Sequence, residues 1–386
     1  MALLEYFPNY VWNLSVAIAM ESGARIGEIE DICRPLAQAA QRGEKVGTAQ
    51  FVERWLSAGD NLIELAEEDR ERGRLLSAAS KLQRAALYLL VAERMQGHGH
   101  PGRSETFAKA QRAFRSAIEM GKENCERVEI PYEHAHFPAL FVRAQGTSGP
   151  APCVLYMNGL DSCKEMLYWS GLAQALAARG ISTLCVDQPG TGEAIRLHGF
   201  CVTHESERWA SRCYDWLAAR DDVRADRIGA VGISLGGYFA PRAVAFEPRF
   251  AAGAAWGANH NWAEVQQRRL QREGENPVPQ YWDHVKWVFG ADSIEDFLEK
   301  SRHMHLNGVL DRIRVPFLIT HGARDRQIAL DYAYQSYDQL VNSPRRELKI
   351  FTEREGGVEH VGADNMSYAR DYIADWFAEV LGGRIA

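Results

Sequence analysis

Several features that mark special classes of protein are missing from this chain of 386 residues. No apolar stretch approaches the roughly 18 uninterrupted residues that a membrane-spanning helix needs. Blocks of about five or six like charges are missing too, and 44 basic against 51 acidic side chains give a net charge of −7. Nothing therefore indicates a nucleic-acid or anionic-membrane partner. With 46% hydrophobic and 25% charged residues, the composition also excludes disorder and collagen-like repeats.

Cysteine pairs with CxxC spacing are missing as well, and the seven cysteines form an odd number. This pattern is typical of reduced thiols rather than of a disulfide framework. The first basic residue is Arg25, so the charged start of a secretory signal peptide is lacking. We therefore expect a cytoplasmic protein.

The sequence divides into two parts of different texture. Up to about residue 124, apolar side chains recur at helical spacing, as in the stripe Phe51, Trp55 and Leu62. We predict an all-helical N-terminal domain over residues 1–125. From residue 126 to 386, short apolar runs alternate with helical segments, which predicts an α/β domain with a mostly parallel sheet and helices on both faces.

One interval, residues 259–311, is too long for a simple crossover between two strands and is rich in Trp, Gln, Arg and Glu. Because open parallel sheets bind ligands outside the carboxyl ends of their strands, we predict a helical insertion forming a lid over that edge. Each aromatic side chain of this region could contact a substrate or could instead pack inside the insertion. The candidates for substrate contact are Trp256, His260, Trp262, Glu264 and Trp282.

The pattern Gly-Ile-Ser-Leu-Gly at 232–236 stands between a strand-like run and a helical stretch. This context is typical of a nucleophile elbow, where a serine occupies a strained turn between strand and helix. The residues two before and two after the serine must be small, because the backbone segments approach closely there. Gly232 and Gly236 meet that requirement, so Ser234 is the predicted nucleophile.

A serine hydroxyl needs a base to activate it, and the base needs a partner that fixes its tautomer. In α/β-hydrolases these residues follow in the order serine, acid, histidine. His360 is the only histidine beyond residue 325, and it stands on a glycine-bearing loop. Asp325 follows the predicted penultimate strand and is the predicted acid, with Asp311, Asp331 and Asp338 as alternatives.

An oxyanion needs two backbone N–H donors, one after the serine and one from the loop that follows an earlier strand. Leu235 provides the first donor. The strand-like run 153–157 leads into Asn-Gly-Leu-Asp-Ser at 158–162, where Gly159 permits a sharp turn. Leu160 is therefore the predicted second donor.

Two other patterns are weak. Asp-Gln-Pro-Gly-Thr-Gly-Glu at 187–193 lacks the third glycine of GxGxxG and the GK[ST] ending of a Walker loop, so we interpret it as a tight connection that lines the pocket. Histidine pairs at two-residue spacing lack the further ligands that a metal ion needs. We expect no metal and no cofactor.

Taken together, the motifs at 158–165, 187–193 and 232–238, with Glu-Pro-Arg at 247–249, resemble the α/β-hydrolases typified by 2,6-dihydroxypseudooxynicotine hydrolase and the fungal polyketide-shortening pigment hydrolases. The resemblance covers nearly the whole chain and implies the α/β-hydrolase fold. It also implies the triad Ser234, Asp325 and His360, a homodimer, and N-terminal helices that cover the site. Because residues 256–262 depart from the nicotine enzyme, its substrate is not carried over.

The family resemblance implies hydrolysis of a carbon–carbon bond next to a ketone. We therefore predict a serine hydrolase that acts through an acyl-enzyme on a polyketide-like or acyl-aromatic small molecule. An esterase, lactonase, amidase or acyltransferase could use the same residues, because acyl-enzyme chemistry serves many leaving groups. A non-catalytic binding protein on the same scaffold is the alternative from another class.

Overall fold

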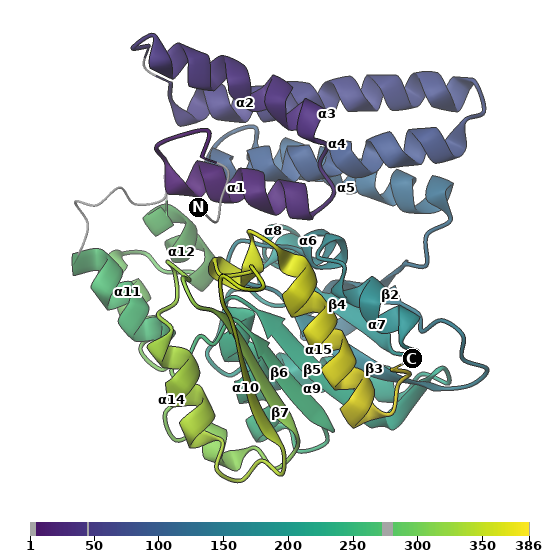
Figure 1. Cartoon of the computed structure of the whole chain (residues 1–386), viewed down its shortest axis with the longest axis vertical. Helices are drawn as coiled ribbons and strands as arrows, with labels where there is room; N and C mark the ends of the chain where they lie inside the picture. Colours follow the sequence, from purple (N-terminus) through teal and green to yellow (C-terminus); the bar gives the residue numbers. More distant parts are fainter. Residues whose placement is uncertain (1–4, 45, 272–280, 386) are drawn as a thin grey trace. The chain divides into compact units, whose positions relative to one another are not determined.

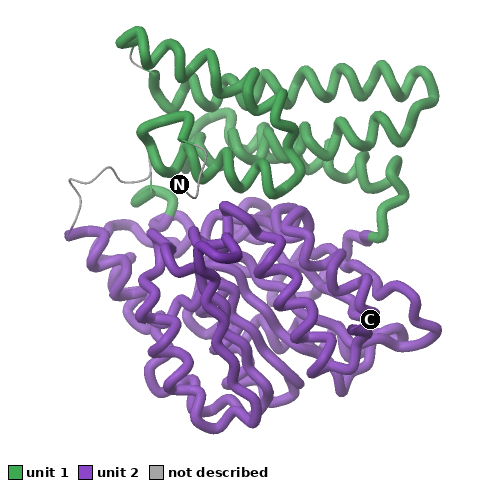
Figure 2. The backbone as a smooth tube through the Cα atoms, viewed as in Figure 1, with its two compact units in different colours: residues 1, 3–124, 276–284 green, residues 2, 125–275, 285–386 purple. Residues whose placement is uncertain are grey.

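The computed structural model describes residues 5–44, 46–271 and 281–385. These residues form two compact units, which Figure 2 draws in different colours. The first unit holds the described residues up to 124 together with 281–284, and the second holds the described residues of 125–271 and 285–385.

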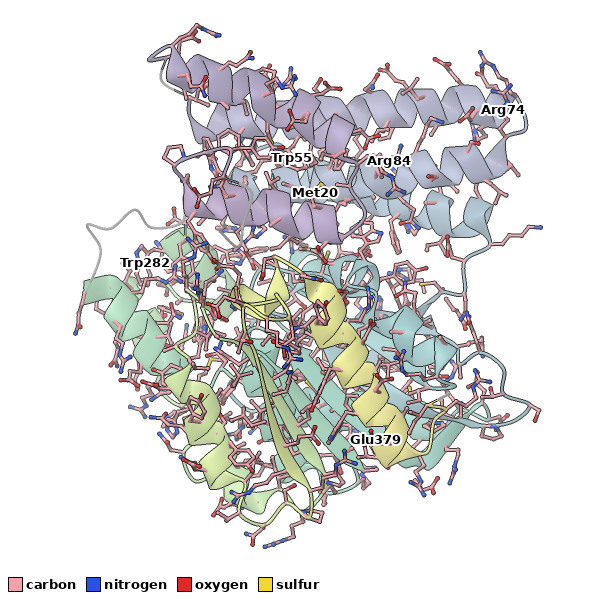
Figure 3. The ribbon with its side chains drawn as sticks, viewed as in Figure 1. Met20, Trp55, Arg74, Arg84, Trp282 and Glu379 are labelled. Carbon is pink, nitrogen blue, oxygen red and sulfur yellow. The ribbon has the colours of Figure 1, made fainter. Side chains whose placement is uncertain are left out.

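The first unit is built from helices that pack around aromatic side chains. Its helices are α1 (Tyr10–Glu21), α2 (Ile26–Gln41), α3 (Thr48–Glu71), α4 (Leu75–Gln96) and α5 (Arg103–Gly121) (Figure 1). The ring of Trp12 stacks on Phe51 with centroids 4.7 Å apart, and Trp55, labelled in Figure 3, meets Tyr88 edge-on at 5.4 Å. A buried ion pair of 2.7 Å joins Arg103 to Glu93. The predicted helical stripe thus forms the core of this unit.

Among the described residues, the second unit contains one eight-stranded sheet in the order β1-β2-β4-β3-β5-β6-β7-β8. Only β1 and β2 run antiparallel to their neighbours. The strands are β1 (Glu126–Tyr132), β2 (Ala135–Val142), β3 (Ala151–Met157), β4 (Ser182–Val186), β5 (Val223–Ile233), β6 (Ala252–Trp256), β7 (Phe317–Gly322) and β8 (Arg346–Phe351). Strands β3, β4, β6 and β7 are buried along their whole length, as expected for a sheet covered on both faces. The edge strand β8 is partly exposed.

Helices cover both faces of the sheet (Figure 1). On one face α9 (Ser206–Ala218) packs with α10 (Gly236–Phe246), and on the other α7 (Leu172–Ala178) packs with α15 (Met366–Leu381). The remaining helices of this unit outside the insertion are α6 (Lys164–Trp169), α8 (Gly192–His198) and α14 (Asp331–Gln339). The arrangement confirms the predicted α/β class.

The segment expected to be a helical insertion does contain helices. They are α11 (Trp262–Gln271), α12 (Tyr281–Phe289) and α13 (Ile294–Ser301), followed by a 3₁₀ turn, η1 (Leu310–Arg312). Residues 272–280 of the predicted insertion lie outside the described residues. The role of the insertion as a lid stays a prediction.

Two findings concern special classes of protein. In the part of the chain that the structure describes, no helix is both long enough and apolar enough to cross a bilayer. The described residues also hold no group of three or more His, Cys, Asp or Glu side chains that could bind a metal ion.

The close contact between α3 and α4 generates a stability prediction. A β carbon added at Gly59 would lie 2.9 Å from Cγ of Leu89, so Gly59→Val should overpack this contact. We expect unfolding to become easier by about 1–3 kcal/mol. Thermal denaturation followed by circular dichroism measures the change. Ser57→Val on the exposed side of the same helix controls for β-branching, and an equal effect of both variants would contradict the prediction.

Candidate active site

Ser234 lies in the turn between β5 and α10, at the carboxyl edge of the sheet. Its φ of 58° places the residue in the left-handed region, which a side chain bearing a β carbon rarely occupies. The Ser234 N–H donates to the carbonyl of Trp256 at 2.9 Å. This bond to the end of β6 fixes the strained turn, as expected for a nucleophile elbow.

Glycines around Ser234 are required by close backbone contacts. A β carbon at Gly232 would lie 2.0 Å from the carbonyl oxygen of Gly236, and one at Gly236 would lie 2.8 Å from the carbonyl oxygen of Met157. Gly237 is equally restricted, because its added β carbon would lie 1.8 Å from the carbonyl oxygen of Gly257. The two glycines of the predicted motif therefore serve the steric purpose expected from the sequence.

The structure brings Ser234, His360 and Asp325 together in one line. Ser234 Oγ lies 2.8 Å from His360 Nε2, and His360 Nδ1 lies 2.8 Å from Asp325 Oδ2. An ionised carboxylate can only accept hydrogen bonds, so Nδ1 carries the proton and Nε2 is left to accept from the serine hydroxyl. This tautomer is the one in which a histidine can take the proton of a nucleophilic serine.

The Asp325 carboxylate is fully buried, and both of its oxygens accept hydrogen bonds. Oδ1 accepts from the N–H groups of Gln327 and Ile328 at 2.8 and 2.9 Å, which leaves Oδ2 for His360. Burial acts to raise the pKa of Asp325, but the charge and hydrogen bond of His360, with smaller effects of His321 and the Ile328 amide, lower it below its usual value. The carboxylate is therefore ionised. In this form it accepts the N–H of His360 Nδ1 and orients the imidazole.

The neighbouring His321 is neutral by its contacts. Its Nδ1 accepts from the N–H of Ala258 at 3.1 Å, and its Nε2 donates to the carbonyl of Ile328 at 3.0 Å. Burial lowers the pKa of His321, in agreement with that tautomer. Among the carboxylates considered from the sequence, Asp311, Asp331 and Asp338 are exposed, and the one in contact with His360 is Asp325.

The loop that carries His360 is anchored by residues that the sequence analysis did not identify. The carboxylate of Asp364 accepts from the N–H groups of residues 357, 358 and 359 at 2.9, 3.1 and 2.8 Å. Glu359 forms a bidentate pair with Arg326 at 2.6 and 3.0 Å. Val361 has a φ of 49°, which is strained for a β-branched residue. An aspartate that follows a glycine-bearing loop is a signal that could have indicated this anchor.

The loop predicted to donate to the oxyanion lies against the nucleophile. A β carbon added at Gly159 would be 3.0 Å from Ser234 Cβ and 3.4 Å from Ser234 Oγ. Leu160 follows at once in the same turn, and Leu235 caps α10 directly after Ser234. The glycine therefore permits close approach to the serine rather than an unusual backbone angle. The donor roles of Leu160 and Leu235 stay predictions.

Two of the predicted pocket residues belong to a network at the base of the insertion. His260 Nδ1 lies 3.0 Å from Ser336 Oγ, and its Nε2 lies 2.9 Å from Asn307 Oδ1. Glu264 accepts from the hydroxyl of Tyr332 at 2.8 Å. Burial lowers the pKa of His260, so the ring is neutral. Because both ring nitrogens are engaged, the arrangement favours a structural role for His260 over the expected contact with substrate.

The three predicted pocket tryptophans lie in different surroundings. Trp256 ends β6, is 1% exposed and stacks on Tyr156 with centroids 6.5 Å apart. Trp262 begins α11 and stacks on Phe289 at 5.3 Å, so it packs within the insertion. Trp282 lies on α12 and is labelled in Figure 3. Contact of these side chains with a substrate stays a prediction.

Comparisons with known proteins identify the family and the fold of this chain. The model of the prolyl oligopeptidase family matches residues 171–384, and that of the FrsA-like esterases matches residues 53–271. The chain is 28% identical to the 2,6-dihydropseudooxynicotine hydrolase of Paenarthrobacter nicotinovorans over 85% of this chain and 83% of the relative. It is also 28% identical to the 20-hydroxy-prefusarin hydrolase of Gibberella moniliformis over 78% of each chain. These matches confirm the family resemblance predicted from the motifs.

Solved structures show the same fold. The crystal structure of the 2,6-dihydroxy-pseudo-oxynicotine hydrolase superposes with a TM-score of 0.76 at 24% identity and covers 95% of both chains. AbyA5 superposes with a TM-score of 0.62 at 20% identity, over 84% of this chain and 89% of that one. The predicted α/β-hydrolase fold is therefore confirmed.

The buried carboxylate generates a test of the site. Asp325→Asn keeps an oxygen for the two amides but presents an NH₂ group to His360, which favours the wrong imidazole tautomer. We expect labelling of Ser234 by a fluorophosphonate to slow by on the order of 10⁴-fold. Gel-based labelling kinetics measure this rate. Asp331→Asn, on the exposed first turn of α14, is the control; similar small effects of both variants would contradict the assignment of the acid.

Proposed function

This chain belongs to the prolyl oligopeptidase and FrsA-like families of α/β-hydrolases, and from that premise we propose that it is a serine hydrolase that cleaves a carbon–carbon bond next to a ketone. Ser234 is the nucleophile, His360 the base and Asp325 the residue that orients the base. The observation that carries the serine-hydrolase part of this proposal is the series of hydrogen bonds from Ser234 Oγ through both nitrogens of His360 to Asp325, each 2.8 Å long.

The first half-reaction forms an acyl-enzyme. Ser234 Oγ bonds to the ketone carbon while its proton moves to His360 Nε2, and the N–H groups of Leu235 and Leu160 stabilise the oxyanion. Collapse of this intermediate breaks the bond to the neighbouring carbon. That carbon leaves as a carbanion stabilised by conjugation and takes the proton held by His360.

The second half-reaction releases the acyl group as an acid. His360 removes a proton from water while the water oxygen bonds to the acyl carbon. When this intermediate collapses, the bond to Ser234 Oγ breaks, and Ser234 Oγ takes the proton from His360. Asp325 stays ionised in both halves and stabilises the imidazolium.

The choice of a carbon–carbon bond rests on family resemblance. The motifs at 158–165, 187–193 and 232–238 resemble those of the nicotine-type and fungal polyketide-type hydrolases. The matches to a pseudooxynicotine hydrolase and to a fungal prefusarin hydrolase support the proposal. The proposal includes a homodimer located in the cytoplasm. Analytical ultracentrifugation would test the oligomeric state.

An ester, lactone or amide is the second candidate substrate. The match of residues 53–271 to the FrsA-like esterases favours it, and the same acyl-enzyme would form with an alkoxide or amine as leaving group. Replacement of water by an alcohol or amine in the second half-reaction would make the protein an acyltransferase.

Loss of the nucleophile tests the proposed enzyme class. Ser234→Ala should abolish labelling by a fluorophosphonate and reduce turnover to the residual level of a site without its nucleophile, about 10³–10⁴-fold above water. Labelling that persists in the variant would assign the nucleophile elsewhere.

The bond type is tested separately with the wild-type enzyme. We expect mass spectrometry to detect two products from β-diketones and aryl ketones, the carboxylic acid and the fragment whose carbon has been protonated, which is a simple ketone in the case of a β-diketone. Matched aryl esters and anilides should be converted more slowly. Turnover of esters without any ketone cleavage would replace the leading proposal by the second candidate.

A further inference from the structure

The segment 187–193 has no role in the proposed mechanism. It is hydrogen-bonded to both ends of the loop that carries Gly159 and Leu160. Strands β3 and β4 pair in parallel as far as Met157 and Val186. Beyond that point the Gln188 side chain continues the pairing. Its Oε1 accepts from the Asn158 N–H at 3.0 Å, and its Nε2 donates to the Asn158 carbonyl at 2.9 Å. Gln188 thus fixes the residue just before Gly159.

The other end of the loop is held by the preceding residue of the same segment. Asp187 Oδ1 accepts from the Lys164 N–H at 2.7 Å, and Oδ2 accepts from the Glu193 N–H at 2.9 Å. A β carbon at Gly192 would lie 2.0 Å from the Asp187 carboxylate, so that carboxylate fills all the space available. Residues 158 and 164 are therefore both hydrogen-bonded to the one segment that follows β4.

A buried cluster of charges keeps Asp187 in place. Lys164 Nζ lies 2.7 Å from Glu165, 3.2 Å from Asp187 and 2.9 Å from Glu193, and the four side chains are at most 7% exposed. Arg127 adds a second cation, 3.2 Å from Glu193. Burial acts to lower the pKa of Lys164, but attraction by Asp187, Glu165 and Glu193 outweighs burial and raises it. The ammonium group therefore stays charged among its three carboxylates.

We propose that Gln188 and Asp187 are positioning residues that clamp residues 158–164, so that the Leu160 amide is held beside Ser234 where the oxyanion forms. The loop between the two clamped residues passes Ser234 so closely that a β carbon at Gly159 would be 3.4 Å from Ser234 Oγ. Since oxyanion donors act only when they are preorganised, fixing both ends of this turn serves transition-state stabilisation rather than substrate binding. The inference rests on the proposed function.

The test compares an inhibitor that forms an oxyanion with one that cannot. Trifluoro-4-phenylbutan-2-one adds to a serine hydroxyl and gives a charged tetrahedral adduct, whereas the corresponding alcohol has the same shape without an electrophile. Both are measured as competitors of fluorophosphonate labelling in wild type, Gln188→Met and Asp187→Asn. Ser182→Ala is the matched control, because it also removes a hydrogen bond from a backbone N–H to a buried side chain, at the opposite end of β4.

We expect both clamp variants to bind the ketone about 10- to 100-fold more weakly, as for a displaced oxyanion donor, while binding of the alcohol is unchanged. Ser182→Ala should leave both affinities as in wild type. Thermal denaturation of each variant identifies the folded ones, and Asp187→Asn, which keeps its size, serves if Gln188→Met does not fold.

Two results would overturn the inference, and they differ from a failure of the proposed function. If wild type is labelled at Ser234 but the clamp variants bind the ketone as wild type does, the clamp has no positioning role. A parallel loss of ketone and alcohol binding would mean general damage to the site, which also overturns it. If wild-type Ser234 takes no label at all, the proposed function fails first and the inference falls with it.

Discussion

The strained backbone of Ser234 is the constraint on which the rest of the site depends. A serine held at positive φ projects its hydroxyl from a turn that is too tight for ordinary side chains nearby. Gly232, Gly236 and Gly237 allow the strand, the helix and the end of β6 to meet around it. Gly159 lets the neighbouring loop approach the hydroxyl itself. Strain at one residue thus dictates the residue type at several positions that are distant in sequence.

The triad shows how one carboxylate can serve two purposes without conflict. Oδ1 of Asp325 closes its own turn through two backbone amides, and Oδ2 orients His360. Because the turn occupies one oxygen completely, the direction of the other is fixed by covalent geometry. His321, which is neutral and held at both nitrogens, lies beside this carboxylate without competing for the proton. The base is thereby oriented by the loop after β7 although it stands after β8.

Much of this could be predicted from the sequence, and the reasons are local. The nucleophile elbow is a short steric pattern, the order of the triad is a property of the fold, and a strand that alternates with helical segments is visible in the apolar runs. The anchoring of His360 by Asp364, the clamp at Gln188 and the burial of Lys164 could not be predicted in the same way. The anchor at Asp364 is local and has only a weak signal, an aspartate after a glycine-bearing loop. The clamp and the lysine cluster depend on contacts between segments whose spacing in the chain carries no information about their distance in space.

The network around His260 has a consequence for how the substrate range of this enzyme could change. The base of the insertion is bonded to α14 through Ser336 and Tyr332, which contact His260 and Glu264. Within the insertion, Asn307 engages the second nitrogen of His260. Outward movement of that base would leave several buried polar groups without their hydrogen-bond partners. Different substrates would therefore be accommodated more readily by substitution of individual side chains than by movement of the base of the insertion.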